Sequence, residues 1–88
     1  MKITFDPKKA ASNFRKHGVR FSDAESVLFD PMALTREDED AEGEQRFVSI
    51  GTDATGTVLV VVFTYHGEEI RLISARRAGA KERAYYED

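Results

Sequence analysis

The sequence contains no cysteine, and it has only two histidines, His17 and His66. The absence of cysteine excludes disulfides and thiol chemistry, and it makes a reducing cytoplasm the simplest location. Neither histidine has a second metal ligand close to it in the sequence, so we expect no metal and no other cofactor. The sequence also lacks an apolar run long enough to cross a bilayer and a signal-peptide pattern at its N-terminus, so we expect no membrane association.

The composition is that of a small folded protein. The 88 residues leave room for one hydrophobic core, and we expect one domain over residues 1–88. Hydrophobic residues make up 41% of the chain and charged residues 33%, which excludes a disordered tail.

The negative charge is concentrated in residues 37–44, here called the acidic segment. It contains six acidic residues and no basic one: Glu37, Asp38, Glu39, Asp40, Glu42 and Glu44. Setting these six aside leaves 10 of the 16 acidic residues against 13 basic ones, so the rest of the chain carries about +3 although the net charge is −3. The segment is either a solvated loop that keeps the protein soluble, or a site for a basic partner or a mask near a basic cleft.

The N-terminal region predicts a short strand followed by a helix. Residues 3–5 have the character of a strand. Asp6 followed by Pro7 is a typical helix start, and Gly18 is a typical helix end. We therefore predict a helix that has Pro7 at its first position and continues through residues 8–17.

A second helix is predicted to begin at Ser22, because Glu25 follows at the spacing of a capping box. The Asp-Pro pair at residues 30–31 should end it. Both helices are too short to be stable alone, so they must pack on a sheet.

The remaining chain predicts strands and a final helix. Four segments have strand character, the first of them as an edge strand: residues 32–35, 46–51, 57–65 and 69–75. Short turns at residues 53–56 and 66–67 imply antiparallel hairpins. Residues 58–63 are apolar on both faces, which predicts a central strand whose second face needs the helix at residues 78–86 or a partner chain. The predicted fold is α+β: a short N-terminal strand, two helices, an antiparallel sheet of about four strands and a C-terminal helix.

The last predicted strand ends in a cluster of cations. Regular alternation predicts Arg71 and Arg77 on one face of this strand, and the other face then holds Ser74 and Arg76. Arginine stays charged at physiological pH, and its planar fork of N–H donors matches phosphate oxygens, so we expect a phosphodiester-binding site. The alternative for each arginine is an ion pair with a neighbouring acid: Glu68, Glu69 or Glu82.

Three further side chains are candidates for this site. Arg46 is a phosphate ligand unless it is tethered to the acidic segment. Ser74 has no Ser-His-Asp spacing around it, so we expect it to hydrogen-bond a phosphate or its own sheet. One of Tyr85 and Tyr86 should belong to the core, and the other could stack on a base or donate a proton; we assign this role to Tyr85.

Lys16 and His17 stand at the end of the first predicted helix, at positions that Gly18 should fix. Histidine is the side chain that titrates near neutrality unaided, so His17 is a candidate general acid or base, with Lys16 adding charge stabilisation. A histidine at this position can equally cap the helix and interact with its dipole. Both hypotheses remain open.

Several motifs, taken in order, carry a resemblance to a known family. In the first part of the chain they are Phe5-Asp6-Pro7, Lys9, Asn13, Lys16-His17-Gly18-Val19 and Phe21. In the second part they are Glu42-Gly43-Glu44-Gln45-Arg46, Ile50-Gly51, Val60-Val61-Val62, Ile70-Arg71-Leu72-Ile73-Ser74-Ala75-Arg76 and Glu82-Arg83 with Tyr85. Over nearly its whole length the chain resembles the BrnT toxins of type II BrnT/BrnA toxin–antitoxin pairs.

This resemblance implies a RelE-like fold and a ribonuclease that inhibits translation. It implies two partners, an RNA substrate and a BrnA-like antitoxin that holds the toxin inactive and that itself binds operator DNA. The alternatives are a non-catalytic module of the same fold that binds a partner, and a DNA-binding regulator, for which no predicted helix is basic enough.

Metal-free RNA cleavage needs a proton acceptor, a proton donor and cations at the phosphate. We favour this route because the acidic segment is too flexible for a precise metal site. The expected catalytic residues are His17, Lys16, Arg76, Arg77 and Tyr85, and the expected phosphate ligands are Arg46, Arg71 and Ser74.

Overall fold

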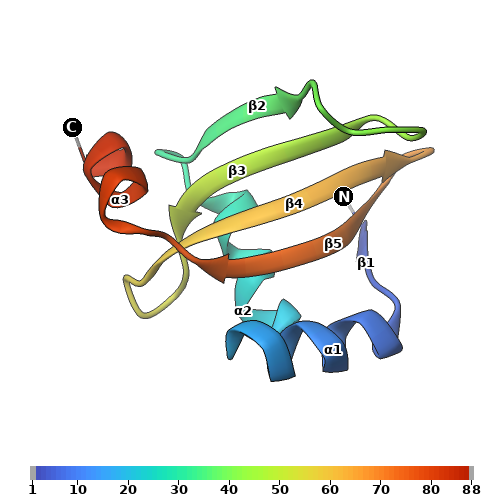
Figure 1. The fold of residues 1–88 in the computed structure, drawn as a ribbon, viewed down its shortest axis with the longest axis horizontal. Helices are drawn as coiled ribbons and strands as arrows, with labels where there is room; N and C mark the ends of the chain where they lie inside the picture. Colours follow the sequence, from blue (N-terminus) through green and yellow to red (C-terminus); the bar gives the residue numbers. More distant parts are fainter. Residues whose placement is uncertain (1, 88) are drawn as a thin grey trace.

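A five-stranded sheet is the framework of the protein in the computed structural model, which describes residues 2–87 (Figure 1). The strands are β1 (Lys2–Thr4), β2 (Leu34–Asp38), β3 (Arg46–Thr52), β4 (Val58–His66) and β5 (Glu69–Arg77). They lie in the order β1-β5-β4-β3-β2, so the apolar strand β4 is central, as predicted. Neighbouring strands are antiparallel except β1, which joins the edge of β5 in parallel. The predicted α+β class is confirmed, and the N-terminal strand makes the sheet mixed.

Among residues 2–87, the helical segments are α1 (Pro7–His17), α2 (Phe21–Glu25), the 3-10 helix η1 (Ser26–Phe29) and α3 (Ala80–Glu87). Helix α1 begins and ends where the sequence predicts. The Asp6 carboxylate accepts the N–H of Lys8, and Gly18 ends the helix with a φ of 70°.

The capping box predicted for the second helix is wrong. Helix α2 begins at Phe21, one residue before the predicted Ser22, and no side chain caps it. The Phe21 side chain is only 2% exposed, and burial of this ring in the core fixes the first turn in place of a cap.

The helices α1, α2 and η1 cover one face of the sheet, and the core lies between them and the sheet (Figure 1). Its buried members are Val19, Phe21, Ala24 and Val27 from the helical layer and Leu59, Val61, Phe63, Ile70, Leu72 and Ala75 from the sheet. Helix α3 lies at one end of the sheet, away from α1 (Figure 1). The opposite face of the sheet is therefore left largely open.

Asn13 joins α1 to the edge of β5. Strand β1 pairs only with residues 69–71 of β5, so the rest of this edge has no neighbouring strand. The buried Asn13 amide donates to the carbonyl of Ala75 at 2.8 Å and accepts the N–H of the same residue at 3.0 Å. Its second N–H donates to the carbonyl of Val19 at 3.1 Å. The side chain thus pairs with β5 as a strand would, and it fixes the C-terminal half of α1 against this edge.

Candidate functional site

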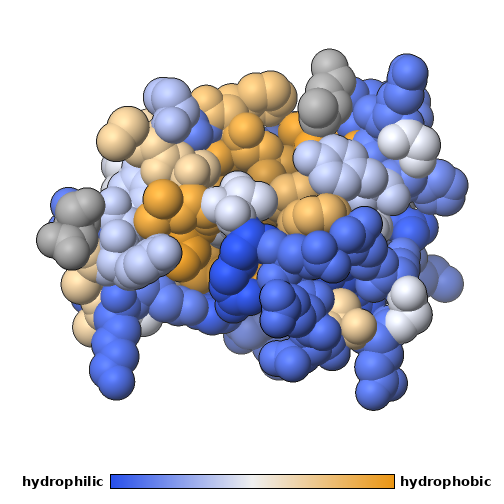
Figure 2. Space-filling view, turned by 90° about the horizontal axis from the view of Figure 1, so that it is seen from above, coloured by the Kyte–Doolittle hydropathy of each residue, from blue (hydrophilic) through white to orange (hydrophobic). Residues whose placement is uncertain are grey.

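The open face of the sheet carries a groove of about 240 Å³. Its floor is apolar and consists of Leu34, Val48, Ile50, Val60 and Val62. Its margin is mostly polar and consists of Thr35, Arg36, Asp38, Ser74, Arg76, Glu82 and Tyr85. The view from above shows apolar side chains gathered in the middle of this face, with hydrophilic side chains around them (Figure 2). The groove is thus bounded by β2, β5 and α3.

A β-bulge in β5 determines which of its arginines lie on the open face of the sheet. Leu72 and Ser74 pair with consecutive residues of β4, so Ile73 between them has no partner. The extra residue reverses the alternation along β5. As a result, Arg71 lies on the same face as Ser74 and Arg76.

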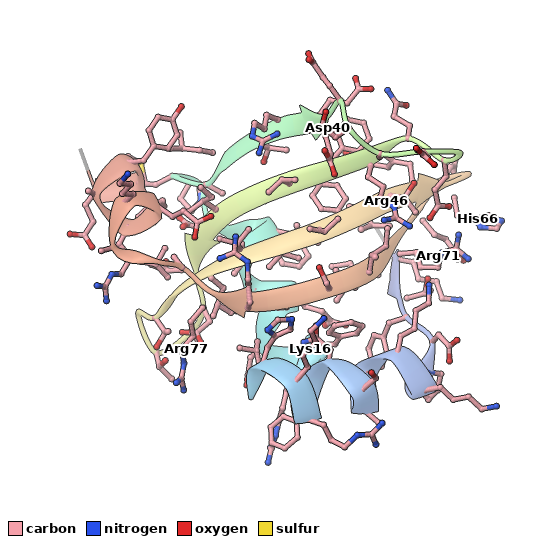
Figure 3. The ribbon with its side chains drawn as sticks, viewed as in Figure 1. Lys16, Asp40, Arg46, His66, Arg71 and Arg77 are labelled. Atoms are coloured by element: carbon pink, nitrogen blue, oxygen red, sulfur yellow. The ribbon has the colours of Figure 1, made fainter. Side chains whose placement is uncertain are left out.

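Arg77 lies apart from these residues. It pairs with Leu59, whose side chain is in the core, and it lines a separate cavity beside Asp53. Arg71 and Arg77 lie toward opposite ends of the sheet (Figure 3). The prediction that Arg71 and Arg77 share a face is therefore wrong, because it assumed an alternation that the bulge interrupts.

At one end of the open face, Arg46 and Arg71 share the carboxylate of Glu44 (Figure 3). Arg71 Nη2 donates to Glu44 Oε2 at 3.2 Å, and Arg46 Nε lies 3.8 Å from Glu44 Oε1. The Nε atom of Arg46 is buried, and no described residue accepts its hydrogen bond. The tether of Arg46 to the acidic segment, an alternative from the sequence, is therefore present, and it extends to Arg71.

At the other end of the groove, Arg76 forms a bidentate ion pair with Glu82. Both contacts measure 2.8 Å, and Glu82 Oε1 also accepts the N–H of Gly79 at 2.8 Å. The hydrogen bonds from Arg76, and then the one from Gly79, lower the pKa of Glu82 to about 2. The ion-pair alternative is thus confirmed for Arg76.

The two tyrosines of α3 have different environments, but the prediction that one of them belongs to the core is wrong, because α3 lies at the end of the sheet and buries no residue. Tyr86 donates its hydroxyl hydrogen to Asp30, which also accepts from the backbone and side chain of Thr52. These hydrogen bonds, with that of Tyr86 the largest cause, lower the pKa of Asp30 to about 2. A Cβ at Gly51 would lie 3.0 Å from this carboxylate, which accounts for a glycine there. Tyr85 is 66% exposed and lines the groove.

Lys16 and His17 line a shallow cavity of about 190 Å³ between α1 and β5. Ser74 lines both this cavity and the groove. His17 is half-buried and Lys16 is exposed on the α1 side of β5 (Figure 3). The structure therefore places this pair beside the groove, next to Ser74, and not on its floor.

Sequence reasoning missed the roles of Glu44 and Asp30. Glu44 stands two residues before Arg46, a proximity that signals an ion pair, but its contact with Arg71 depends on the fold. Asp30 stands before a proline and was assigned only to the end of a helix. Nothing in the local sequence indicates its bond to Tyr86, which lies 56 residues further along the chain.

The fold is similar to that of a known ribonuclease toxin. The chain matches the crystal structure of the Brucella abortus ribonuclease toxin, BrnT, with a TM-score of 0.72 and 30% sequence identity, over 90% of this chain and 97% of that chain. The model of the family "ribonuclease toxin, BrnT, of type II toxin–antitoxin system" matches residues 5–82. The chain belongs to this BrnT family. No curated protein matches the sequence, and among the described residues no helix is long and apolar enough to cross a membrane.

Proposed function

We propose that the chain is a metal-independent endoribonuclease that cleaves single-stranded RNA in the cytoplasm and so inhibits translation. The observation that carries this proposal is that Arg71, Ser74 and Arg76 lie on the same open face of the sheet, where Ser74, Arg76 and Tyr85 line the groove. Membership of a ribonuclease toxin family supports it.

The groove suits an unpaired strand. Arg71 and Arg76 stand roughly 15 Å apart along β5, at the strand rise of about 3.3 Å per residue, so they bind phosphates that are not adjacent. The apolar floor and the exposed ring of Tyr85 offer surfaces on which an unstacked base can lie. We place the scissile phosphate at the Arg76 end, where Ser74 and Tyr85 also lie.

Cleavage at this end is a transesterification. The 2′-oxygen attacks the phosphorus while the bond to the 5′-oxygen breaks, which leaves a 2′,3′-cyclic phosphate and a 5′-hydroxyl. One group takes the proton of the 2′-hydroxyl and another protonates the 5′-oxygen; His17 and Tyr85 are the two candidates. Arg76 and Lys16 stabilise the charge on the phosphate, and Ser74 hydrogen-bonds it.

The test compares arginines on the two faces of β5. Arg76→Ala should lower kcat by roughly a hundredfold, as the loss of a transition-state donor does, and Arg71→Ala should raise KM. Arg77→Ala is the matched control, since it removes the same charge from the same strand but outside the groove, and it should retain activity. Loss of activity in all three variants, or only through unfolding, would contradict the proposed site.

Metal independence is supported by what surrounds the groove. Within residues 2–87, no three His, Cys, Asp or Glu side chains gather into a group that could hold a metal ion. Charge stabilisation therefore falls to the arginines. Cleavage should persist in excess EDTA and give 2′,3′-cyclic phosphate ends. Activity that EDTA removes and magnesium restores, or products with 3′-hydroxyl ends, would contradict the claim.

A protein partner is favoured by the uncovered apolar floor of the groove, since exposed apolar surface of this kind is usually a contact site. A toxin of a type II system has an antitoxin partner. We propose that this partner is a small BrnA-like protein, and that the complex contacts operator DNA only through it. The complex should retard operator DNA on a gel, and the toxin alone should not.

Expression of the toxin alone distinguishes an enzyme from a non-catalytic binding module. Growth arrest with loss of RNA supports the enzyme.

A further inference from the structure

Arg76 has one unused edge of N–H donors. Nη1 donates to Glu82 and, at 3.3 Å, to the carbonyl oxygen of Arg77, and Nη2 donates to the second carboxylate oxygen of Glu82. A guanidinium group has five N–H bonds, so the Nε–H and the second N–H of Nη2 remain. No described residue accepts from them. Together they form the edge of the fork that matches two oxygens of a phosphate.

Glu82 is itself held in place. Its Oε1 accepts the N–H of Gly79 at the start of α3, and its side chain is 32% exposed, against 45% for Arg76. Helix α3 is in turn fixed to η1 and β3 through the bond between Tyr86 and Asp30. The carboxylate is therefore a fixed support for the guanidinium and not a mobile counter-ion.

We propose that Glu82 is a positioning residue, which orients Arg76 so that its unused edge meets the scissile phosphate. This inference rests on the proposed ribonuclease function. A pre-oriented fork loses less conformational entropy at each turnover than a mobile one. The opposing hypothesis is that Glu82 only masks the charge of Arg76. The two hypotheses predict different effects of removing the Glu82 carboxylate. If Glu82 positions Arg76, its removal slows RNA cleavage. If Glu82 masks the charge of Arg76, its removal strengthens RNA binding.

The experiment is a double-mutant cycle on RNA cleavage with the parent, Glu82→Gln, Arg76→Ala and the double variant. Glutamine can still accept the N–H of Gly79, so α3 keeps its start. Glu87→Gln is the control, because it removes the same charge from the same helix. We expect Glu82→Gln to lower kcat roughly tenfold with little change in KM, and to have almost no further effect in the Arg76→Ala background.

A second measurement does not depend on activity. In ¹⁵N spectra at slightly acidic pH, the Nη1 and Nη2 signals of Arg76, assigned by their loss in Arg76→Ala, should be resolved separately in the parent, because the bonds to Glu82 hinder rotation about the Cζ–Nη bonds. The signals should average in Glu82→Gln and stay separate in Glu87→Gln. A parent that cleaves no RNA overturns the proposed function, and the spectra still test whether Glu82 orients Arg76.

Three results would overturn the inference. Equal losses from Glu82→Gln in both backgrounds would show that Glu82 affects cleavage independently of Arg76. Tighter RNA binding without loss of kcat would make it a mask. A mobile Arg76 side chain in the parent spectra would show that Glu82 does not hold the guanidinium in one orientation.

Discussion

Glu44 is shared by two arginines, Arg46 and Arg71, at the end of the open face remote from α3. All three side chains are about 40% exposed, so solvent screens the contacts and a single pair contributes little to stability. The contact to Arg46 is also too long for a hydrogen bond, and the buried Nε of Arg46 has no acceptor among the described residues. We expect a phosphate group, which has more oxygens than the carboxylate, to replace Glu44 at these two arginines.

Replacing Glu44 by glutamine should therefore strengthen RNA binding, by roughly fivefold for an exposed pair of about 1 kcal/mol. The measurement is the Kd for an oligonucleotide made uncleavable by 2′-deoxy substitution. Glu42→Gln is the control, since Glu42 is exposed in the same segment and forms no ion pair within the described part of the chain. An equal gain from both variants would assign the effect to net charge, and no gain would show that Glu44 does not compete with RNA.

At the scale of whole elements, the features that the sequence predicts well are local ones. The start and end of α1 follow from Asp6, Pro7 and Gly18, whose conformational preferences act within a few residues. The central place of β4 follows from its two apolar faces. The predicted edge strand at residues 32–35 is shifted, because β2 runs into the acidic segment as far as Asp38 and pairs there with β3.

The features that escape prediction are those decided between elements. The parallel pairing of β1 with β5 joins segments more than 60 residues apart. Ile73 has no sequence mark of a bulge, yet the bulge decides which arginines of β5 lie on the open face. The candidate site was therefore predicted in its residue types, but the grouping of Arg71 with Arg76 required the register of the sheet.

Two side-chain contacts anchor helix α3, the ion pair of Glu82 with Arg76 and the hydrogen bond from Tyr86 to Asp30. Asp30 has its pKa lowered from 3.8 to about 2 in the folded protein, so its stabilising contribution is fully present above about pH 4 and is lost as the pH falls toward 2. Tyr86→Phe should lower the free energy of unfolding at neutral pH, because Asp30 loses the hydrogen bond from the hydroxyl. The deficit should shrink between pH 4 and pH 2, because Asp30 becomes protonated in both proteins.

Urea unfolding at a series of pH values measures how the Tyr86→Phe deficit depends on pH, with Tyr85→Phe as the control. Tyr85 is on the same helix, but its hydroxyl is exposed, and it should show no deficit at any pH. A Tyr86→Phe deficit that stays constant down to pH 2 would mean that the hydroxyl acts without the charge of Asp30.

The attachment of α1 to β5 should depend on both donors of the Asn13 amide. In Asn13→Asp the carboxylate can still accept the N–H of Ala75, but it faces the carbonyl oxygens of Ala75 and Val19 without a hydrogen to share. We expect a loss of about 2–4 kcal/mol in the free energy of unfolding, because buried acceptors are left unpaired. The measurement is chemical denaturation with Ser12→Asp, an exposed neighbour on the same helix, as the control. Equal effects of both substitutions would assign the loss to helix charge and not to the amide.

At the scale of the whole molecule, the helices cover one face of the sheet and leave the other open. The chain therefore has its core on one side of the sheet and a groove on the other, where we propose that RNA binds (Figure 1). Its net charge of −3 would repel RNA if it were spread evenly. The exposed acids of the acidic segment, Glu37, Glu39, Asp40 and Glu42, contribute to that charge from outside the groove.

Neutralising these four acids with Gln or Asn raises the formal net charge from −3 to +1. RNA association should become several-fold faster in low salt, through long-range attraction alone. In roughly 1 M salt, where the Debye length is about 3 Å, this gain should vanish, whereas part of the gain from Glu44→Gln should persist because Glu44 touches the arginines directly. Stopped-flow association rates with the uncleavable oligonucleotide, measured across salt concentrations, distinguish the two effects. A gain in the fourfold variant that does not depend on salt would mean that the acidic segment reshapes the groove or contacts RNA itself, and the exposed acids would then belong to the site and not to its surrounding field.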